Sequence, residues 1–165
     1  MYWSRGGRRG GIFKAEMDGS NSVQIGHGLT DPAGITIDFV SLRLFWVEYE
    51  AHLVRSSDLE GTDVYLVAQL DDRTYPWGIA VSGGRIYWGT WKSNLLQTSD
   101  KTGHDIRTLL HDEHDIMQLT VATANPNQTR RNHCEGQICS IGICVLTKSS
   151  SRCIAWLKRL CFWKE

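Results

Sequence analysis

The sequence is short of proline, of net charge and of long apolar runs. It contains three prolines, and its 18 basic and 18 acidic side chains cancel. Without an excess of positive charge, binding to nucleic acid or to an anionic membrane surface is not expected. No stretch approaches the roughly 20 apolar residues of a membrane span, and residues 1–5 lack the apolar core of a signal peptide. We therefore expect neither a membrane span nor a targeting segment within this chain.

Sequence motifs for catalysis are also missing. The chain has no Gly-x-Ser-x-Gly nucleophile turn and no glycine-rich phosphate loop. Its densest polar run, from His111 to Asp115, could in principle hold a metal ion, but a solvated loop is the commoner explanation. The sequence thus predicts a protein that is not an enzyme and that holds neither a cofactor nor a metal.

Cysteine is absent before Cys134, and all five cysteines follow from there to Cys161. Such clustering indicates a second, small module, because dense cysteine in a segment too short for a core most often forms disulfides in an oxidising compartment. A zinc site is the alternative, although the Cys-x4-Cys spacings do not form the usual two pairs of ligands.

Glycine and tryptophan are abundant, with 16 and seven residues, and 41% of the chain is hydrophobic. Many short strands joined by tight turns and packed through aromatic side chains would have this composition. The composition therefore predicts a globular, all-β protein.

Three markers repeat about every 42 residues. Each repeat has an aromatic residue followed by tryptophan, at Tyr2-Trp3, Phe45-Trp46 and Tyr87-Trp88. A turn glycine follows with the same spacing, at Gly19, Gly61 and Gly103, and a second glycine, at Gly34 and Gly78, keeps nearly the same spacing. Between these markers apolar residues alternate with polar ones, as expected of half-buried strands, and the pair Gly83-Gly84 suits a two-residue hairpin. A repeat of this length with about four strands indicates a blade of a β-propeller.

The repeat resembles the YWTD repeats of the LDL-receptor-related proteins. The segments 44–48 (LFWVE) and 86–90 (IYWGT) are similar to the LYWTD strand of that family, and 17–21 (MDGSN) is similar to its LDGSN turn. The turn at 101–103, the segment 115–117 and Asn132-x-Cys134 resemble the passage from a last blade into an EGF-like module. The resemblance implies part of a six-bladed propeller, about three blades of four antiparallel strands, followed by a small disulfide-rich module.

The resemblance also implies the domain boundaries and disulfides. We expect propeller blades over 1–124, a linker over 125–133 and a degenerate EGF-like module over 134–165. The expected disulfides join Cys134 to Cys144 and Cys139 to Cys153. Ala155 stands where the family has its fifth cysteine, which leaves Cys161 without its usual partner. The acidic lead of a calcium-binding EGF module is missing before Cys134, so no calcium site is expected.

The chain departs from the family at the end of the YWTD motif. The aspartate of the motif is replaced by Arg5, Glu48 and Thr90. We expect the polar contacts of that aspartate to be weakened or rearranged.

Three repeats are fewer than a closed ring needs. Residues 2–25 are expected to supply only the three outer strands of a blade, and 115–121 an innermost strand with no blade of its own. The chain is therefore interpreted as part of a longer receptor; the alternative is a ring made by two copies.

Propeller topology brings the loops before the inner strands and after the second strands to one face. There we expect ligand-binding residues, given that aromatic side chains flanked by charges are common anchors of protein interfaces. For Trp77 and Trp91, packing between blades is an equally good explanation. The expected set is Glu48, Tyr49, Tyr75, Trp77, Trp91 and His114.

The function implied by the resemblance is non-catalytic binding of protein ligands, by a lipoprotein-receptor-related, endocytic receptor. It would lie on the extracellular side of the plasma membrane or in the secretory and endosomal lumen. Acid-dependent release of ligand would involve the loop histidines His104, His111 and His114, which are otherwise simply exposed. Asn127 begins an N-glycosylation sequon. The alternatives are a scaffold propeller of the matrix or of a Wnt co-receptor and, more remotely, a hydrolytic propeller of the gluconolactonase type, for which the inner strands offer only Asp38 and Asp115.

Overall fold

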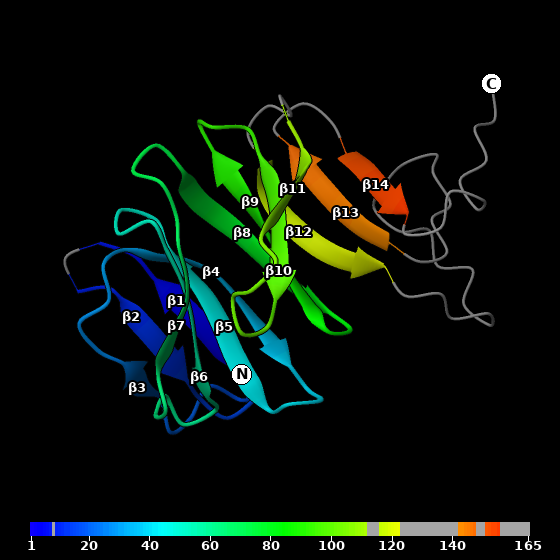
Figure 1. The fold of residues 1–165 in the computed structure, drawn as a ribbon. Helices are drawn as coiled ribbons and strands as arrows, with labels where there is room; N and C mark the ends of the chain where they lie inside the picture. The colour runs from blue at the N-terminus through cyan, green and yellow to red at the C-terminus, as the bar shows by residue number, and fades with distance from the viewer. Residues whose placement is uncertain (8, 112–115, 123–141, 148–150, 156–165) are drawn as a thin grey trace, which may run out of the picture.

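The computed structural model describes residues 1–7, 9–111, 116–122, 142–147 and 151–155, and every regular element in these ranges is a β-strand. The strands form four antiparallel sheets that follow one another in sequence order, from the blue sheet at the N-terminus to the yellow and orange one (Figure 1). Within each sheet, strands consecutive in sequence are hydrogen-bonded neighbours. The predicted all-β class and the partial propeller are confirmed.

The first sheet has three strands, as expected from its sequence: β1 (Tyr2–Arg5), β2 (Gly11–Lys14) and β3 (Val23–Gly26). The second sheet contains β4 (Pro32–Asp38), β5 (Arg43–Glu48), β6 (Leu53–Asp58) and β7 (Tyr65–Gln69). The third contains β8 (Tyr75–Ser82), β9 (Arg85–Trp91), β10 (Leu96–Asp100) and β11 (Arg107–Leu110). The fourth contains β12 (Ile116–Ala122), β13 (Gly142–Thr147) and β14 (Ser151–Ala155).

The fourth sheet corrects one expectation. Residues 115–121 were expected to form an innermost strand with no blade of its own, but β12 pairs with β13, which pairs with β14. Both partner strands come from the cysteine-rich part of the chain. The reason is that the outer edge of β12 carries unpaired backbone groups, which a nearby hairpin can satisfy. The EGF-like arrangement of 134–165 stays a prediction, since much of it lies outside the described residues.

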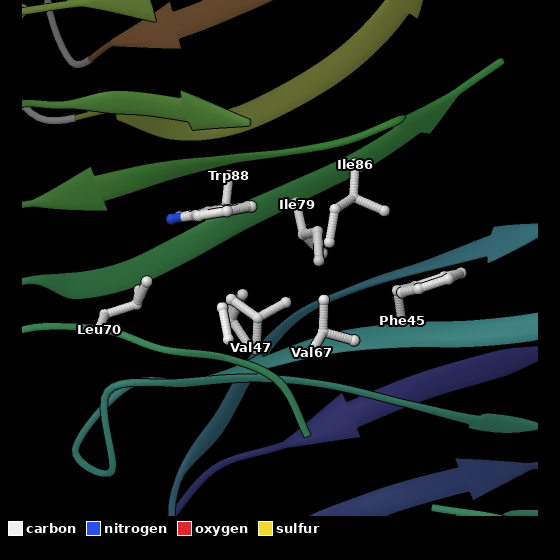
Figure 2. Close-up of a cluster of buried hydrophobic side chains, with 9 residues drawn as sticks. Phe45, Val47, Val67, Leu70, Ile79, Ile86 and Trp88 are labelled. Carbon is white, nitrogen blue, oxygen red and sulfur yellow. The ribbon is translucent and has the colours of Figure 1, made fainter. Parts of the chain in front are cut away.

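The aromatic-tryptophan pairs hold neighbouring sheets together. Successive side chains of a strand point to opposite faces, so Phe45 faces the third sheet while Trp46 faces the first. The cluster between the second and third sheets has Trp88 and Ile86 on one side and Phe45 and Val47 on the other (Figure 2). Trp46 packs with Leu44 and Ile12 between the first and second sheets. Each repeat therefore contributes to two interfaces.

The turn glycines lie at contacts between sheets. Gly61 and Gly103 have φ values of +79° and +89°, a region that disfavours residues with a Cβ. A Cβ on Gly61 would lie 2.1 Å from the carbonyl oxygen of Ile25 in β3, and one on Gly103 would lie 1.8 Å from that of Val67 in β7. Each of these turns thus presses directly on the outer strand of the preceding sheet.

A buried carboxylate connects the second and third sheets. Asp38, which is 5% exposed, accepts hydrogen bonds from Lys101 Nζ, Ser41 Oγ and the amide of Val40. Burial alone would raise the pKa of Asp38, but the hydrogen bonds and the charge of Lys101 outweigh it and hold this pKa below its ordinary value. The ionised carboxylate therefore stabilises the interface.

Acid should remove the stabilising contribution of the ionised Asp38 carboxylate. Because the folded pKa of Asp38 is depressed, its stabilising effect is present above the unfolded value of about 4 and is lost as the pH falls through the folded value. We expect an Asp38→Asn variant to be less stable than the natural chain near pH 7, with the difference shrinking below about pH 4. Urea unfolding of both proteins across this range measures the difference, and a pH-independent gap would contradict the role given to the charge.

Candidate binding surface

The loops that propeller topology predicted to share one face lie together at one end of the second and third sheets. Pro32 at the start of β4 pairs with Glu48 at the end of β5, and Tyr75 at the start of β8 pairs with Trp91 at the end of β9. The amide of Tyr49 donates to the Asp31 carbonyl oxygen at 3.1 Å. The residues before the inner strand and after the second strand therefore lie side by side.

Four aromatic residues from these loops form a continuous cluster. Tyr49 is central: its ring centroid lies 5.1 Å from that of Tyr75, 5.5 Å from Trp77 and 5.7 Å from Trp91. The Trp77 and Trp91 rings meet edge to face at 5.8 Å. All four side chains are half-buried. This aromatic cluster packs the second sheet against the third, as the interpretation of packing between blades expects, and it leaves part of its rings accessible. Ligand binding by these residues stays a prediction.

Lys92 and His52, which the sequence interpretation omitted, border the aromatic cluster. Lys92 Nζ lies 4.4 Å from the Tyr75 ring centroid and 5.6 Å from that of Trp91, within the range of cation–π attraction. The His52 ring lies 4.8 Å from Tyr75, and its Nδ1 is 2.8 Å from the Thr74 carbonyl oxygen. The sequence could have indicated Lys92 as part of this surface, because Lys92 directly follows the predicted residue Trp91. For His52, only the fold brings the ring to Tyr75.

The ammonium group of Lys92 is exposed and pairs with no carboxylate among the residues that the structure describes. Its loop is ordered by Thr90, one of the replacements of the YWTD aspartate. Thr90 Oγ1 accepts from the Leu95 amide at 2.9 Å and from Ser93 Oγ at 2.8 Å. Thr90 itself is buried. Its hydroxyl group thus fixes the loop that carries Lys92.

Glu48, a predicted ligand contact, is instead buried in the second sheet. It is 1% exposed, and its carboxylate accepts from the Thr30 amide at 2.8 Å and from Trp46 Nε1 at 3.3 Å. Arg55 Nε lies 3.1 Å from Glu48 Oε1 in an ion pair, although its geometry is not that of a hydrogen bond. Glu48 is therefore a structural residue in this fold, and its carboxylate is not presented at the surface.

A cleft lies between the inner strands, next to the aromatic cluster. It has a volume of about 410 Å³ and is bordered by Trp77, by Ser4 and Asp31 and by residues of β12. Ser4 Oγ donates to the Ala33 carbonyl oxygen, and Asp31 accepts from the Gly7 amide at 2.6 Å. The side chains of Ser4 and Asp31 in this cleft are thus already hydrogen-bonded to the backbone.

Other predicted residues lie elsewhere. His104 and His111 are exposed and occupy other loops, with His104 Nδ1 at 2.9 Å from Thr102 Oγ1. Arg5 is exposed and donates to the Arg9 carbonyl oxygen. In the backbone register of β13 and β14, Cys144 lies opposite Cys153. His114, Asn127, Cys134, Cys139 and Cys161 lie outside the described residues. No helix of the described part is long and apolar enough to cross a membrane.

Comparisons with known proteins agree with this fold. No protein-family model matches the chain. The low-density lipoprotein receptor-related protein 5 of Mus musculus is 27% identical over 143 residues, which are 86% of this chain and 9% of that protein. The vitellogenin receptor of Solenopsis invicta is 33% identical over 153 residues, 90% of this chain and 8% of the receptor. The chain thus spans less than a tenth of the curated relatives that it matches.

The fold is also that of a solved propeller. A structure of a nidogen/laminin complex superposes with a TM-score of 0.72 at 20% identity, covering 93% of this chain and 55% of that one. At that identity the likeness concerns the fold alone. Together with the curated relatives, it confirms the resemblance that the repeat motifs indicated. The chain is a homologue of the LDL-receptor-related proteins and corresponds to part of a propeller of the YWTD type.

Proposed function

We propose that this chain is a non-catalytic, extracellular binding unit of a lipoprotein-receptor-related protein and that the aromatic cluster with Lys92 contacts its protein ligand. The observation that carries the proposal is the meeting of Tyr49, Tyr75, Trp77 and Trp91 at the loop end of two sheets. Half-buried aromatic residues already held by their neighbours lose little side-chain entropy on binding, which makes them efficient anchors.

The chemistry of the surface supports a ligand that brings an apolar side chain together with a carboxylate. The rings supply the apolar contact, and the Lys92 ammonium lies over them without a carboxylate of its own among the described residues. A ligand carboxylate could pair with this ammonium while an adjacent apolar group covers Trp77 or Trp91. Glu48 has no part in this surface, because it is buried.

The proteins to which this chain is similar suggest three probes for a binding test. Low-density lipoprotein, vitellogenin and laminin would each be immobilised and exposed to the natural chain, to Trp77→Ala and to Lys92→Glu, with surface plasmon resonance as the readout. For the probe that binds, we expect each variant to weaken binding about 10-fold or more, as hot-spot residues do. The matched control is Phe39→Ala, an aromatic substitution in an exposed turn outside the cluster, which should bind as the natural chain does.

Failure of all three probes, or equal binding by Trp77→Ala and the natural chain, would contradict the proposal. Binding of laminin alone would favour the alternative function, a matrix scaffold, which rests on the likeness to the nidogen/laminin structure. Repeating the assay near pH 5.5 tests the acid-dependent release that the resemblance implies. His52 extends the set of candidates for that release, because its ring touches Tyr75.

A further inference from the structure

A cavity of about 310 Å³ lies between the first and second sheets. Both sheets that enclose it belong to the described part of the chain. Arg55 and Ser57 of β6 and His27 of the loop after β3 contribute polar groups to its wall. The rest of the wall is mainly apolar and includes Ile12, Ile25, Leu29, Leu44 and Trp46.

Small side chains in the first sheet account for this cavity. The strand pairings align the interface between the first and second sheets with the one between the second and third, where nine buried residues pack together. At three aligned positions the first sheet carries a smaller residue than the second. These are Ser4 for Val47, Gly26 for Ala68 and Gly28 for Leu70. Because the turns at Gly61 and Gly103 press on the preceding sheet in the same way at both interfaces, the missing volume is left as open space.

Arg55 brings a positive charge to the wall of this cavity. It lies opposite Trp46, at the position where the third sheet has Gln97 opposite Trp88. Gln97 accepts a hydrogen bond from the Trp88 indole, but a guanidinium has no acceptor. The Trp46 indole donates to Glu48 instead. Arg55 therefore does not take over the structural role of the residue with which it is aligned.

The guanidinium of Arg55 has donors that the described residues leave unused. Its Nε is buried without a hydrogen bond, although Glu48 Oε1 lies 3.1 Å away. Neither Nη atom donates to an acceptor in the part of the chain that the structure describes. With Glu48 on the Nε side, the end-on pair of Nη atoms is left for a second acceptor. A carboxylate fits this pair best, because its two oxygens accept two parallel N–H bonds.

We propose that this cavity binds a medium-chain fatty acid anion, with its acyl chain against Ile12, Leu29 and Trp46 and its carboxylate on the Nη atoms of Arg55. The volume of about 310 Å³ lies at the lower end of the range of small-molecule sites, roughly 300 to 1,000 Å³. If a methylene group takes about the space of a water molecule, about 30 Å³, the cavity has room for about ten non-hydrogen atoms, the size of octanoate. Burial of the acyl chain supplies affinity, and Arg55 selects the charged head group.

The test titrates the natural chain with octanoate labelled with ¹³C at its carboxyl carbon and follows the carboxyl signal by NMR. We expect saturable binding at a single site, with a Kd of about 0.1 to 1 mM for a ligand of this size. Octanol has the same chain without the charge. It should displace the labelled octanoate only at concentrations about 10-fold higher or more, because it cannot form the paired, charge-assisted hydrogen bonds with Arg55.

Two variants locate the site. Arg55→Gln installs the residue that the third sheet has at the aligned position, and it should weaken octanoate binding about 10-fold or more. Val64 lines the cavity and is 49% exposed, so Val64→Trp should fill the space without disturbing the core and abolish saturation. The matched control is Ile106→Trp, at the aligned position of the third sheet, where the side chain is 46% exposed. It should bind octanoate as the natural chain does.

Lys92→Glu separates this site from the aromatic cluster and should bind octanoate as the natural chain does. Loss of binding in Lys92→Glu would place the octanoate at the cluster and overturn the proposal. Lack of saturation by octanoate, equal binding of octanol, or equal binding by Val64→Trp and Ile106→Trp would also overturn it. The octanol and Val64→Trp comparisons decide the proposal even where Arg55→Gln fails to fold.

Discussion

Replacing Trp88 by alanine is expected to lower the free energy of unfolding by about 3 to 5 kcal/mol, the range for truncating a buried aromatic side chain. Trp88 is fully buried between the second and third sheets, where it contacts the largest apolar cluster of the described chain (Figure 2). The substitution also leaves Gln97 Oε1 without the indole donor at 3.1 Å. Urea denaturation followed by circular dichroism gives the difference in unfolding free energy.

The control for Trp88 is Phe39→Ala. Phe39 is 78% exposed in the turn between β4 and β5, so its truncation removes little packing and should change stability by less than about 0.5 kcal/mol. A Trp88→Ala variant as stable as Phe39→Ala would contradict the assignment of this tryptophan to the interface between sheets.

Alanine at Gly103 should cost about 3 kcal/mol, although it adds a single methyl group. A residue with a Cβ loses about 1 to 2 kcal/mol in the left-handed region that Gly103 occupies. The added Cβ would also lie 1.8 Å from the carbonyl oxygen of Val67, and overpacking of this kind costs a further 1 to 3 kcal/mol or so. Urea denaturation again provides the measurement.

Substitution of Gly83 separates the cost of the backbone conformation from the cost of overpacking. It also has a positive φ, of +55°, but nothing lies within 4 Å of a Cβ built there. Gly83→Ala should therefore show only the conformational part, about 1 kcal/mol. If Gly83→Ala and Gly103→Ala were equally destabilising, the contact between the turn and β7 would contribute nothing, contrary to the structure.

Much of the fold could be predicted from sequence because the repeat is local. The spacing of Trp3, Trp46 and Trp88 and of the turn glycines reflects the length of one set of strands, and strands adjacent in sequence pair with each other. The aromatic cluster could be predicted for a related reason. Once a propeller is assumed, its topology brings residues before an inner strand and after a second strand to the same end.

Two features could not be predicted because they depend on contacts that spacing does not reveal. Glu48 stands at the end of a strand, where exposure is common, yet the amide of Thr30, the indole of Trp46 and the guanidinium of Arg55 hold its carboxylate inside. The pairing of β13 with β12 joins segments across a cysteine-containing stretch. Cysteine clustering indicated a separate module, but an edge strand accepts any partner whose backbone reaches it.

The apolar clusters each join one sheet only to the next, so the folded chain should behave as a linear array of coupled units rather than as a single cooperative block. The coupling is uneven. Nine buried residues form the cluster between the second and third sheets, whereas three form the one between the first and second. Unfolding should therefore start at the N-terminal sheet and leave the middle pair as the last structured part. Amide exchange would then slow progressively from β1 to β9.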